Sequence, residues 1–183
     1  MLIKTTNEYT LSFDFFSITK RGSFAGAQKS KIVMNLSLYP YEVSLDYKEY
    51  EFFSEGPKGR IKKRVIYEKI SDNPQIYNLA FGDVDPVSDM IRDRSTSNNN
   101  DRDLVLATVA HTVGDFVKRY AQPLIYIEGS TKSRTRLYQI SLNKIVDEVQ
   151  PLYTIYGYRA NAWEAFRKSV NYEAFVVQQK KIS

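Results

Sequence analysis

A β-hairpin is the feature of this sequence that most constrains its fold. The residues Gly56-Pro-Lys-Gly59 form a Gly/Pro turn between two stretches rich in β-preferring residues, at 39–55 and 60–70. In the second stretch, apolar and basic side chains alternate with a period of two, so one face of that strand is apolar and the other basic. A third strand over 75–83 follows. The sequence therefore predicts three strands before any helix.

Two helices are predicted in the second half of the chain. The run Asp93-Arg-Ser-Thr-Ser-Asn-Asn-Asn100 has no apolar residue to bury and predicts a flexible loop. Its last residue or Asp101 can cap the helix that follows, and Asp103 suits the positive end of that helix. The stripe that predicts this helix consists of Val105, Val109, Thr112, Phe116 and Tyr120. A short apolar strand over 124–127 leads into a second helix that stops near 149.

The order of these elements defines the expected fold class. With a final pair of strands at 153–158 and 172–178, the order is βββαβαββ. We expect an α+β fold, with an antiparallel or mixed sheet of about five to six strands and two helices packed on one face. A chain of 183 residues suits a single domain, here 39–183, preceded by a peripheral N-terminal extension over 1–38.

Composition excludes several classes of function. The chain has no cysteine, which rules out disulfides, thiolate metal sites and a cysteine nucleophile, and indicates a reducing compartment. No uncharged stretch approaches the roughly 18 residues of a membrane span, so we expect a cytoplasmic protein without membrane contact. The net charge of +5 weakly favours anionic partners. Neither a Walker loop nor a G-x-G-x-x-G motif is present, so no cofactor is indicated.

The turn between the 124–127 strand and the second helix is the main candidate site. A strand, a tight turn and a helix start present backbone N–H groups and the positive helix end to an anion. The basic residues lie where the helix dipole disfavours a cation by about 0.3–1 kcal/mol, and a bound phosphate would offset that cost. The predicted anion-binding residues are Gly129, Ser130, Thr131, Lys132, Arg134 and Arg136. The alternative is that Ser130, Thr131 or Ser133 caps the helix and that the cations are solvated or paired.

A second basic group lies along the hairpin, where aromatic side chains are interleaved. Cations and aromatic rings on a sheet can bind single-stranded nucleic acid through phosphate contacts and base stacking. The alternative is a solvated edge strand whose aromatic residues face the core. The basic residues of this group are Lys58, Arg60, Lys62, Lys63 and Arg64.

The sequence shows no catalytic triad, and we assign no catalytic residue. His111 and Asp115 are spaced so that His111 could act as a general base and Asp115 could orient it, although an exposed helix face is the simpler interpretation. Carboxylates that could hold magnesium, as in a phosphodiesterase, are Asp83, Asp85, Asp101 and Asp103. Turn and cap chemistry is the alternative for these four.

Several segments together resemble an uncharacterised bacterial family of unknown function. They are Glu55-Gly-Pro-Lys-Gly59, Tyr77-Asn-Leu-Ala-Phe-Gly-Asp83, Ser97-Asn-Asn-Asn-Asp-Arg-Asp-Leu-Val-Leu-Ala-Thr-Val109 and Gly129-Ser-Thr-Lys-Ser-Arg-Thr-Arg-Leu-Tyr138. The resemblance covers about residues 39–180 and implies no known activity. It also implies that many members have glycine at the position of Asn100, which would matter only if the loop needs a positive φ there.

These features support three hypotheses of function. The leading one is a module that binds a phosphate-bearing ligand, or nucleic acid, at residues 129–136. The first alternative is a metal-dependent phosphoester hydrolase in which Asp83, Asp101 or Asp103 holds magnesium beside the same turn. The second alternative is a protein-interaction or regulatory module that uses an aromatic surface. Whether the protein is an enzyme stays open at this stage.

Overall fold

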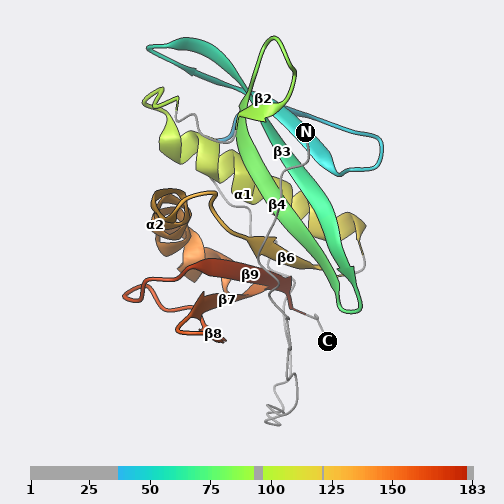
Figure 1. The fold of residues 1–183 in the computed structure, drawn as a ribbon, viewed down its shortest axis with the longest axis vertical. Helices are drawn as coiled ribbons and strands as arrows, with labels where there is room; N and C mark the ends of the chain where they lie inside the picture. The colour runs from blue at the N-terminus through green and yellow to red at the C-terminus, as the bar shows by residue number, and fades with distance from the viewer. Residues whose placement is uncertain (1–36, 93–96, 121, 181–183) are drawn as a thin grey trace. The chain divides into compact units, whose positions relative to one another are not determined.

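The fold of residues 37–92, 97–120 and 122–180 is described by a computed structural model (Figure 1). Of the predicted extension over 1–38, residues 1–36 lie outside the described residues. The described residues form nine strands and two helices. The strands are β1 (Tyr41–Val43), β2 (Glu49–Gly56), β3 (Gly59–Asp72), β4 (Gln75–Val84), β5 (Ile91–Arg92), β6 (Leu124–Ile127), β7 (Tyr153–Arg159), β8 (Ala162–Ala165) and β9 (Ala174–Gln179). The helices are α1 (Arg102–Arg119) and α2 (Lys132–Val149). The α+β class is confirmed.

The sheet is larger than the sequence predicts, and its elements follow a different order. In the described part of the chain, nine strands form one mixed sheet in the order β1-β2-β3-β4-β6-β9-β7-β8, with β5 paired to β4. The expected five to six strands and the order βββαβαββ were therefore wrong. The additional strands β1, β5 and β8 are two to four residues long, so they are defined by their pairing partner and not by a sequence pattern.

The hairpin that dominates the sequence is present with the predicted turn. β2 and β3 pair antiparallel, and Gly56 faces Gly59 at the turn. Gly59 has a φ of 84°, a conformation that glycine adopts without a steric cost. β4 continues the antiparallel pairing, and α1 then connects it to β6, which pairs parallel with β4. This crossover places the start of α1 near the same end of the sheet as the hairpin turn (Figure 1).

Both helices cover the same face of the sheet. Cross-strand partners share a face, and Tyr77, Ile125, Val177 and Ile155 form one such row across β4, β6, β9 and β7. All four belong to a single core cluster that also contains residues of both helices. From α1, the predicted stripe residues Val105, Val109, Thr112 and Phe116 are buried. From α2, Val146 and Val149 are buried.

The residues that precede α1 have an unusual backbone. Asn98 and Asn100 have positive φ values of 43° and 62°. Asparagine tolerates this left-handed region better than most residues, and glycine tolerates it best. The loop therefore does need a positive φ at Asn100, the condition under which glycine at this position would matter.

Neither α1 nor α2 is long and apolar enough to cross a membrane.

The aromatic centre of the core gives a prediction for stability. Phe116 of α1 is fully buried and stacks on Tyr67 of β3, with 4.0 Å between ring centroids. We expect Phe116→Ala to lower the free energy of unfolding by about 3–5 kcal/mol, because the substitution removes buried apolar surface and leaves a cavity. Urea denaturation followed by circular dichroism measures this loss. The control is Lys118→Ala, an exposed position on the same helix, for which a change beyond about 0.5 kcal/mol would contradict the account.

Candidate functional site

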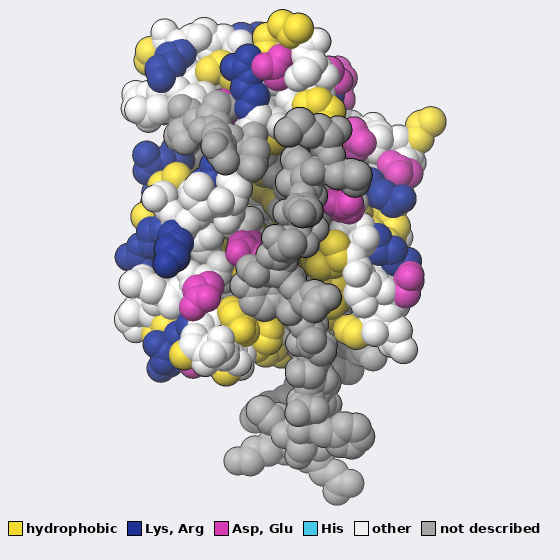
Figure 2. Space-filling model, viewed as in Figure 1, with side chains coloured by type: hydrophobic (Ala, Val, Ile, Leu, Met, Phe, Trp, Pro, Cys, Tyr) yellow, Lys and Arg dark blue, Asp and Glu magenta, His cyan; other side chains and the backbone are white. Residues whose placement is uncertain are grey.

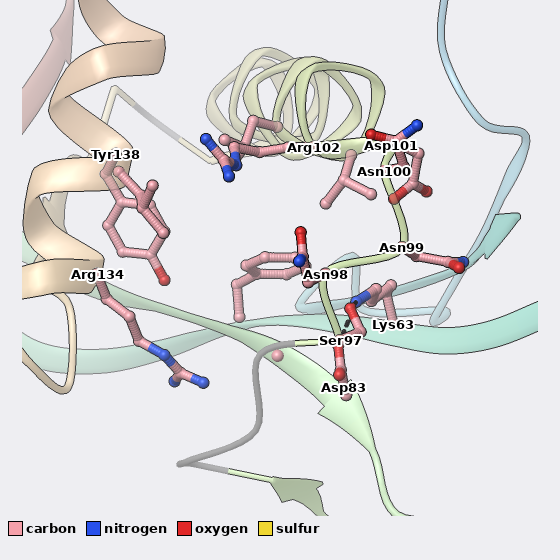
Figure 3. A pocket seen from close by; sticks show the side chains of 15 residues that line it. Lys63, Asp83, Ser97, Asn98, Asn99, Asn100, Asp101, Arg102, Arg134 and Tyr138 are labelled. Atoms are coloured by element: carbon pink, nitrogen blue, oxygen red, sulfur yellow. Dashed lines mark hydrogen bonds and ion pairs between the residues drawn. The ribbon is translucent and has the colours of Figure 1, made fainter. Parts of the chain in front are cut away.

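A cavity of about 120 Å³ lies between the N-terminal halves of the two helices and one end of the sheet (Figure 3). β4 supplies one side of it, α1 and α2 supply two others, and the residues just before α1 complete it. The side chains from the strands and helices are Lys63, Phe81, Asp83, Arg102, Val105, Leu106, Arg134, Leu137 and Tyr138. The remaining lining residues are Gly82 and the run Ser97–Asp101, which we call the 97–101 loop. Three of the four segments that carry the family resemblance thus line one cavity.

The 97–101 loop is fixed to the β2–β3 hairpin by the side chain of Asn99. This side chain is only 2% exposed, and its amide oxygen accepts the backbone N–H of Lys58 at 2.8 Å. Its amide nitrogen donates to the Ser54 hydroxyl at 3.0 Å and to the Gly59 carbonyl at 2.9 Å. A Cβ on Gly56 would come within 1.9 Å of the Asn99 carbonyl oxygen. The hairpin turn therefore needs a glycine at position 56 for the loop to lie against it.

Asp101 stands at the junction of the loop and α1. One of its carboxylate oxygens accepts hydrogen bonds from the hydroxyls of Ser54 at 2.6 Å and Tyr39 at 2.8 Å. Although Asp101 is the N-cap residue of α1, its side chain makes no capping hydrogen bond. Burial raises the pKa of the Tyr39 phenol, and the nearby Asp101 carboxylate raises it further. The Asp101 side chain thus binds the start of α1 to the strand layer.

A buried ion pair lies at the base of the cavity. Lys63 of β3 and Asp83 of β4 are register partners, and the Lys63 ammonium donates to the Asp83 carboxylate. Lys63 also donates to the Ser97 hydroxyl at 2.6 Å. Lys63 is 4% exposed and Asp83 8% exposed, so both charges are almost entirely removed from water. Each is tolerated because the other compensates it, which makes this pair a fixed support for the 97–101 loop.

The polar groups of the predicted anion-binding turn are engaged largely in hydrogen bonds that cap α2. The Thr131 hydroxyl accepts the backbone N–H of Arg134 at 3.3 Å, and the Gly129 N–H donates to the Thr135 hydroxyl at 3.1 Å. A Cβ on Gly129 would collide with the backbone nitrogen of Thr135 at 2.3 Å. The capping alternative therefore describes the turn itself.

The basic residues that follow this turn make different contacts. Arg134 is half-buried, extends into the cavity and donates to the Ser130 hydroxyl at 3.0 Å (Figure 3). Arg136 instead donates to the side chain of Asn171, outside the cavity. Lys132 is exposed at the first position of α2 and does not line the cavity. Of the six predicted anion-binding residues, Arg134 is the one that the structure brings to this cavity.

The second predicted group, on the hairpin, is mostly ion-paired. Arg64 contacts Glu51 at 2.5 Å and Asp89 at 2.8 Å, and Lys62 contacts the same two carboxylates. Arg60 lies over the ring of Phe53, with 3.8 Å to the ring centroid. On the face shown in Figure 2, basic and acidic side chains are interspersed.

The aromatic residues beside this group mostly face the core. Tyr50, Phe52 and Tyr67 are buried there. Lys58 lies apart from the other cations, because its ammonium donates to the Ser97 carbonyl at 2.6 Å. Nucleic-acid binding at this face stays a prediction.

The candidate magnesium ligands are spread over separate interactions. Asp85 accepts two backbone N–H groups and a bond from Arg92, and these lower the pKa of its carboxyl to about 2. Asp103 pairs with Lys144 at 2.7 Å on the surface and does not line the cavity. In the described residues, no three His, Cys, Asp or Glu side chains gather in a way that could hold a metal ion.

His111 does not have the interaction that the sequence suggested. Its Nδ1 lies 3.0 Å from the hydroxyl of Tyr41, which also donates to Asp115 at 3.4 Å. Burial, with the Asp115 carboxylate second, raises the pKa of Tyr41 to about 12. His111 is half-buried and belongs to this tyrosine contact, away from the cavity.

Sequence reasoning missed several residues of the site. Lys63 was grouped with solvated cations, yet it lies two positions before Val65 and four before Tyr67, which places it on the buried face of β3. That alternation was the signal that could have found it. A cation at the first position of α1 was the signal for Arg102. Tyr138 carried no signal, because its relevance depends on how α1 and α2 meet.

Comparison with known proteins identifies a family. The sequence model of DUF6934, described as a family of unknown function, matches residues 35–180, and the chain belongs to this family. The predicted resemblance to a family of unknown function is thereby confirmed, while its bacterial character stays a prediction. No curated protein and no solved structure matches the chain.

The buried ion pair gives a prediction that a double-mutant cycle can test. We expect Lys63→Met or Asp83→Leu alone to lower the free energy of unfolding by about 3–5 kcal/mol, because each removes the opposite charge from beside a buried charge. The double variant should lose less than either single variant, since no buried charge remains. Chemical denaturation of the four proteins measures the coupling. Additive losses would show that the two charges do not compensate each other.

Proposed function

We propose that this protein binds a small phosphate-bearing ligand in the cavity, with Arg102 and Arg134 as its charge partners. The observation that carries the proposal is that these arginines belong to the first turns of two different helices and line the same cavity (Figure 3). The positive end of a helix disfavours a cation in its first turn. Two helices that both carry this cost at one cavity indicate an anion that compensates it.

The start of α1 adds donors to the same place. The first N–H groups of a helix have no partner within the helix, and an anion can accept from them. The N-cap residue of α1, Asp101, makes no capping hydrogen bond with its side chain. Arg102, the first residue of α1, and Asn100, just before it, both line the cavity. The start of α1 and the two arginine side chains therefore lie at one cavity.

The charges around the cavity leave a net attraction for an anion. Lys63 and Asp83 compensate each other, so this pair contributes little net charge. The negative charge of Asp101 is stabilised by the hydroxyls of Ser54 and Tyr39. Arg102 and Arg134 bring two positive charges to the lining of the same cavity. A guanidinium presents five N–H donors in a fork that matches phosphate, so one of them can hold Ser130 while others bind an anion.

The size of the cavity limits the ligand. A volume of about 120 Å³ is below the roughly 300–1,000 Å³ of pockets that enclose a drug-sized ligand. The cavity therefore suits a phosphate group with a small substituent, and a nucleic acid could place no more than a terminal phosphate in it. Binding, as opposed to metal-assisted hydrolysis, is the function that we propose. Asp83 and Asp101 line the cavity, but Lys63 and two hydroxyls already engage them.

The two arginines of α2 provide a matched test of the proposal. We expect inorganic phosphate to bind the wild-type protein, and Arg134→Ala to weaken that binding by about tenfold or more, because a charge-assisted hydrogen bond contributes about 1.5–3 kcal/mol. Arg136→Ala is the control, since Arg136 lies two residues away on the same helix and contacts Asn171 instead. Isothermal titration calorimetry at low and high salt measures both affinities, and the wild-type affinity should fall as salt rises.

Two results would contradict the proposal. One is the absence of phosphate binding by the wild-type protein at millimolar concentrations. The other is an equal loss of binding in the Arg134→Ala and Arg136→Ala variants. Unfolding is not an expected cause of lost binding, because removal of a cation from the first turn of α2 relieves an unfavourable interaction with the helix dipole.

A further inference from the structure

We infer that the ligand is an organic phosphate whose phosphate group is joined to a small apolar body, with a single ring as the best fit. This inference rests on the proposed function and names the chemical class of the ligand. It is carried by the apolar wall of the cavity. That wall consists of Phe81, Val105, Leu106, Leu137 and Tyr138.

Two leucines show that this wall is not simply an edge of the core. Leu106 of α1 and Leu137 of α2 are half-buried, yet neither is a member of the described core cluster or of the partly buried residues packed against it. Both line the cavity. Part of their apolar surface is therefore presented to the cavity. Leaving such surface against water is unfavourable, and an apolar ligand group would remove it from water.

Most polar and apolar groups of the lining come from different positions along the chain. The polar residues Ser97, Asn98 and Asn100 come from the 97–101 loop, and the two arginines lie at the starts of the helices. The leucines follow one turn later on each helix, at positions 106 and 137, and Phe81 belongs to the strand layer. An inorganic phosphate ion would use the arginines and leave the apolar wall in contact with water. A ligand with an anionic group and an apolar body would cover both.

The volume favours a single small ring. An apolar cavity of about 150 Å³ can hold one benzene molecule. At about 120 Å³, the present cavity suits a body no larger than such a ring, with the phosphate outside the enclosed volume near the exposed Arg102. A fused base together with a sugar is larger than this volume and could not be enclosed by it. Tyr138 extends its ring toward the cavity (Figure 3), where it can contact a planar group.

The experiment compares three probes in the full chain. They are inorganic phosphate, glycerol 2-phosphate and phenyl phosphate, of which the last two differ in the polarity of the body joined to the phosphate. We expect phenyl phosphate to bind about tenfold more tightly than the other two, because the wall removes its ring from water. Calorimetric titration of each probe at one ionic strength gives the three affinities.

A pair of variants on α2 tests the role of the wall. Leu137→Asn should reduce the preference for phenyl phosphate over glycerol 2-phosphate to about twofold or less. Ile140→Asn is the control, because Ile140 is an exposed residue of the same helix that does not line the cavity. This control should keep the full preference. Circular dichroism of both variants checks that they are folded.

The outcomes separate this inference from the proposed function. If inorganic phosphate does not bind, the proposed function fails. If inorganic phosphate binds with the Arg134 dependence described above but phenyl phosphate binds no more tightly, the inference about the apolar body is overturned. Equal effects of Leu137→Asn and Ile140→Asn on the preference would also overturn it. A preference for glycerol 2-phosphate would indicate a polar ligand and contradict the inference.

Discussion

The attachment of the 97–101 loop to the β2–β3 hairpin is the interaction on which the site depends. It is a buried network of hydrogen bonds. Asn99 is hydrogen-bonded to the hairpin turn, and Asp101 accepts hydrogen bonds from Ser54 and Tyr39. Lys63 donates a hydrogen bond to Ser97. Polar groups that are removed from water must be hydrogen-bonded, and an incomplete network would destabilise the fold. The network therefore permits essentially one position for the loop, and this position sets where α1 begins.

The fold could be predicted from the sequence where a local pattern defines an element. The Gly56–Gly59 turn, the alternation in β3 and the apolar stripe of α1 each report their own structure, and all three were predicted correctly. The arrangement of the sheet could not be predicted in this way. β9, the last strand, lies between β6 and β7. This placement arises from packing among strands far apart in the sequence, and no local pattern records it.

The site was predicted only in part, for a related reason. The cations at the start of α2 marked Arg134 because they break a local rule of helix electrostatics. The same rule applied to α1 would also have marked Arg102. Lys63 was misplaced because it was grouped with its neighbours Lys62 and Arg64, which are ion-paired on the other face of the strand, although the period of two assigns Lys63 to the opposite face. Convergence of the two helices on one cavity needed the tertiary structure.

The most direct test of the account is the location of the bound anion. A titration of the ¹⁵N-labelled protein with phosphate, followed by amide chemical shifts, would locate it residue by residue. The account predicts saturable shifts at Asn98, Asn100, Arg102 and Arg134, which surround the cavity, and no such shifts at the hairpin cations Arg60, Lys62 and Arg64, which do not line it. Shifts confined to the hairpin cations, or to the region around Arg136 and Asn171, would contradict the account.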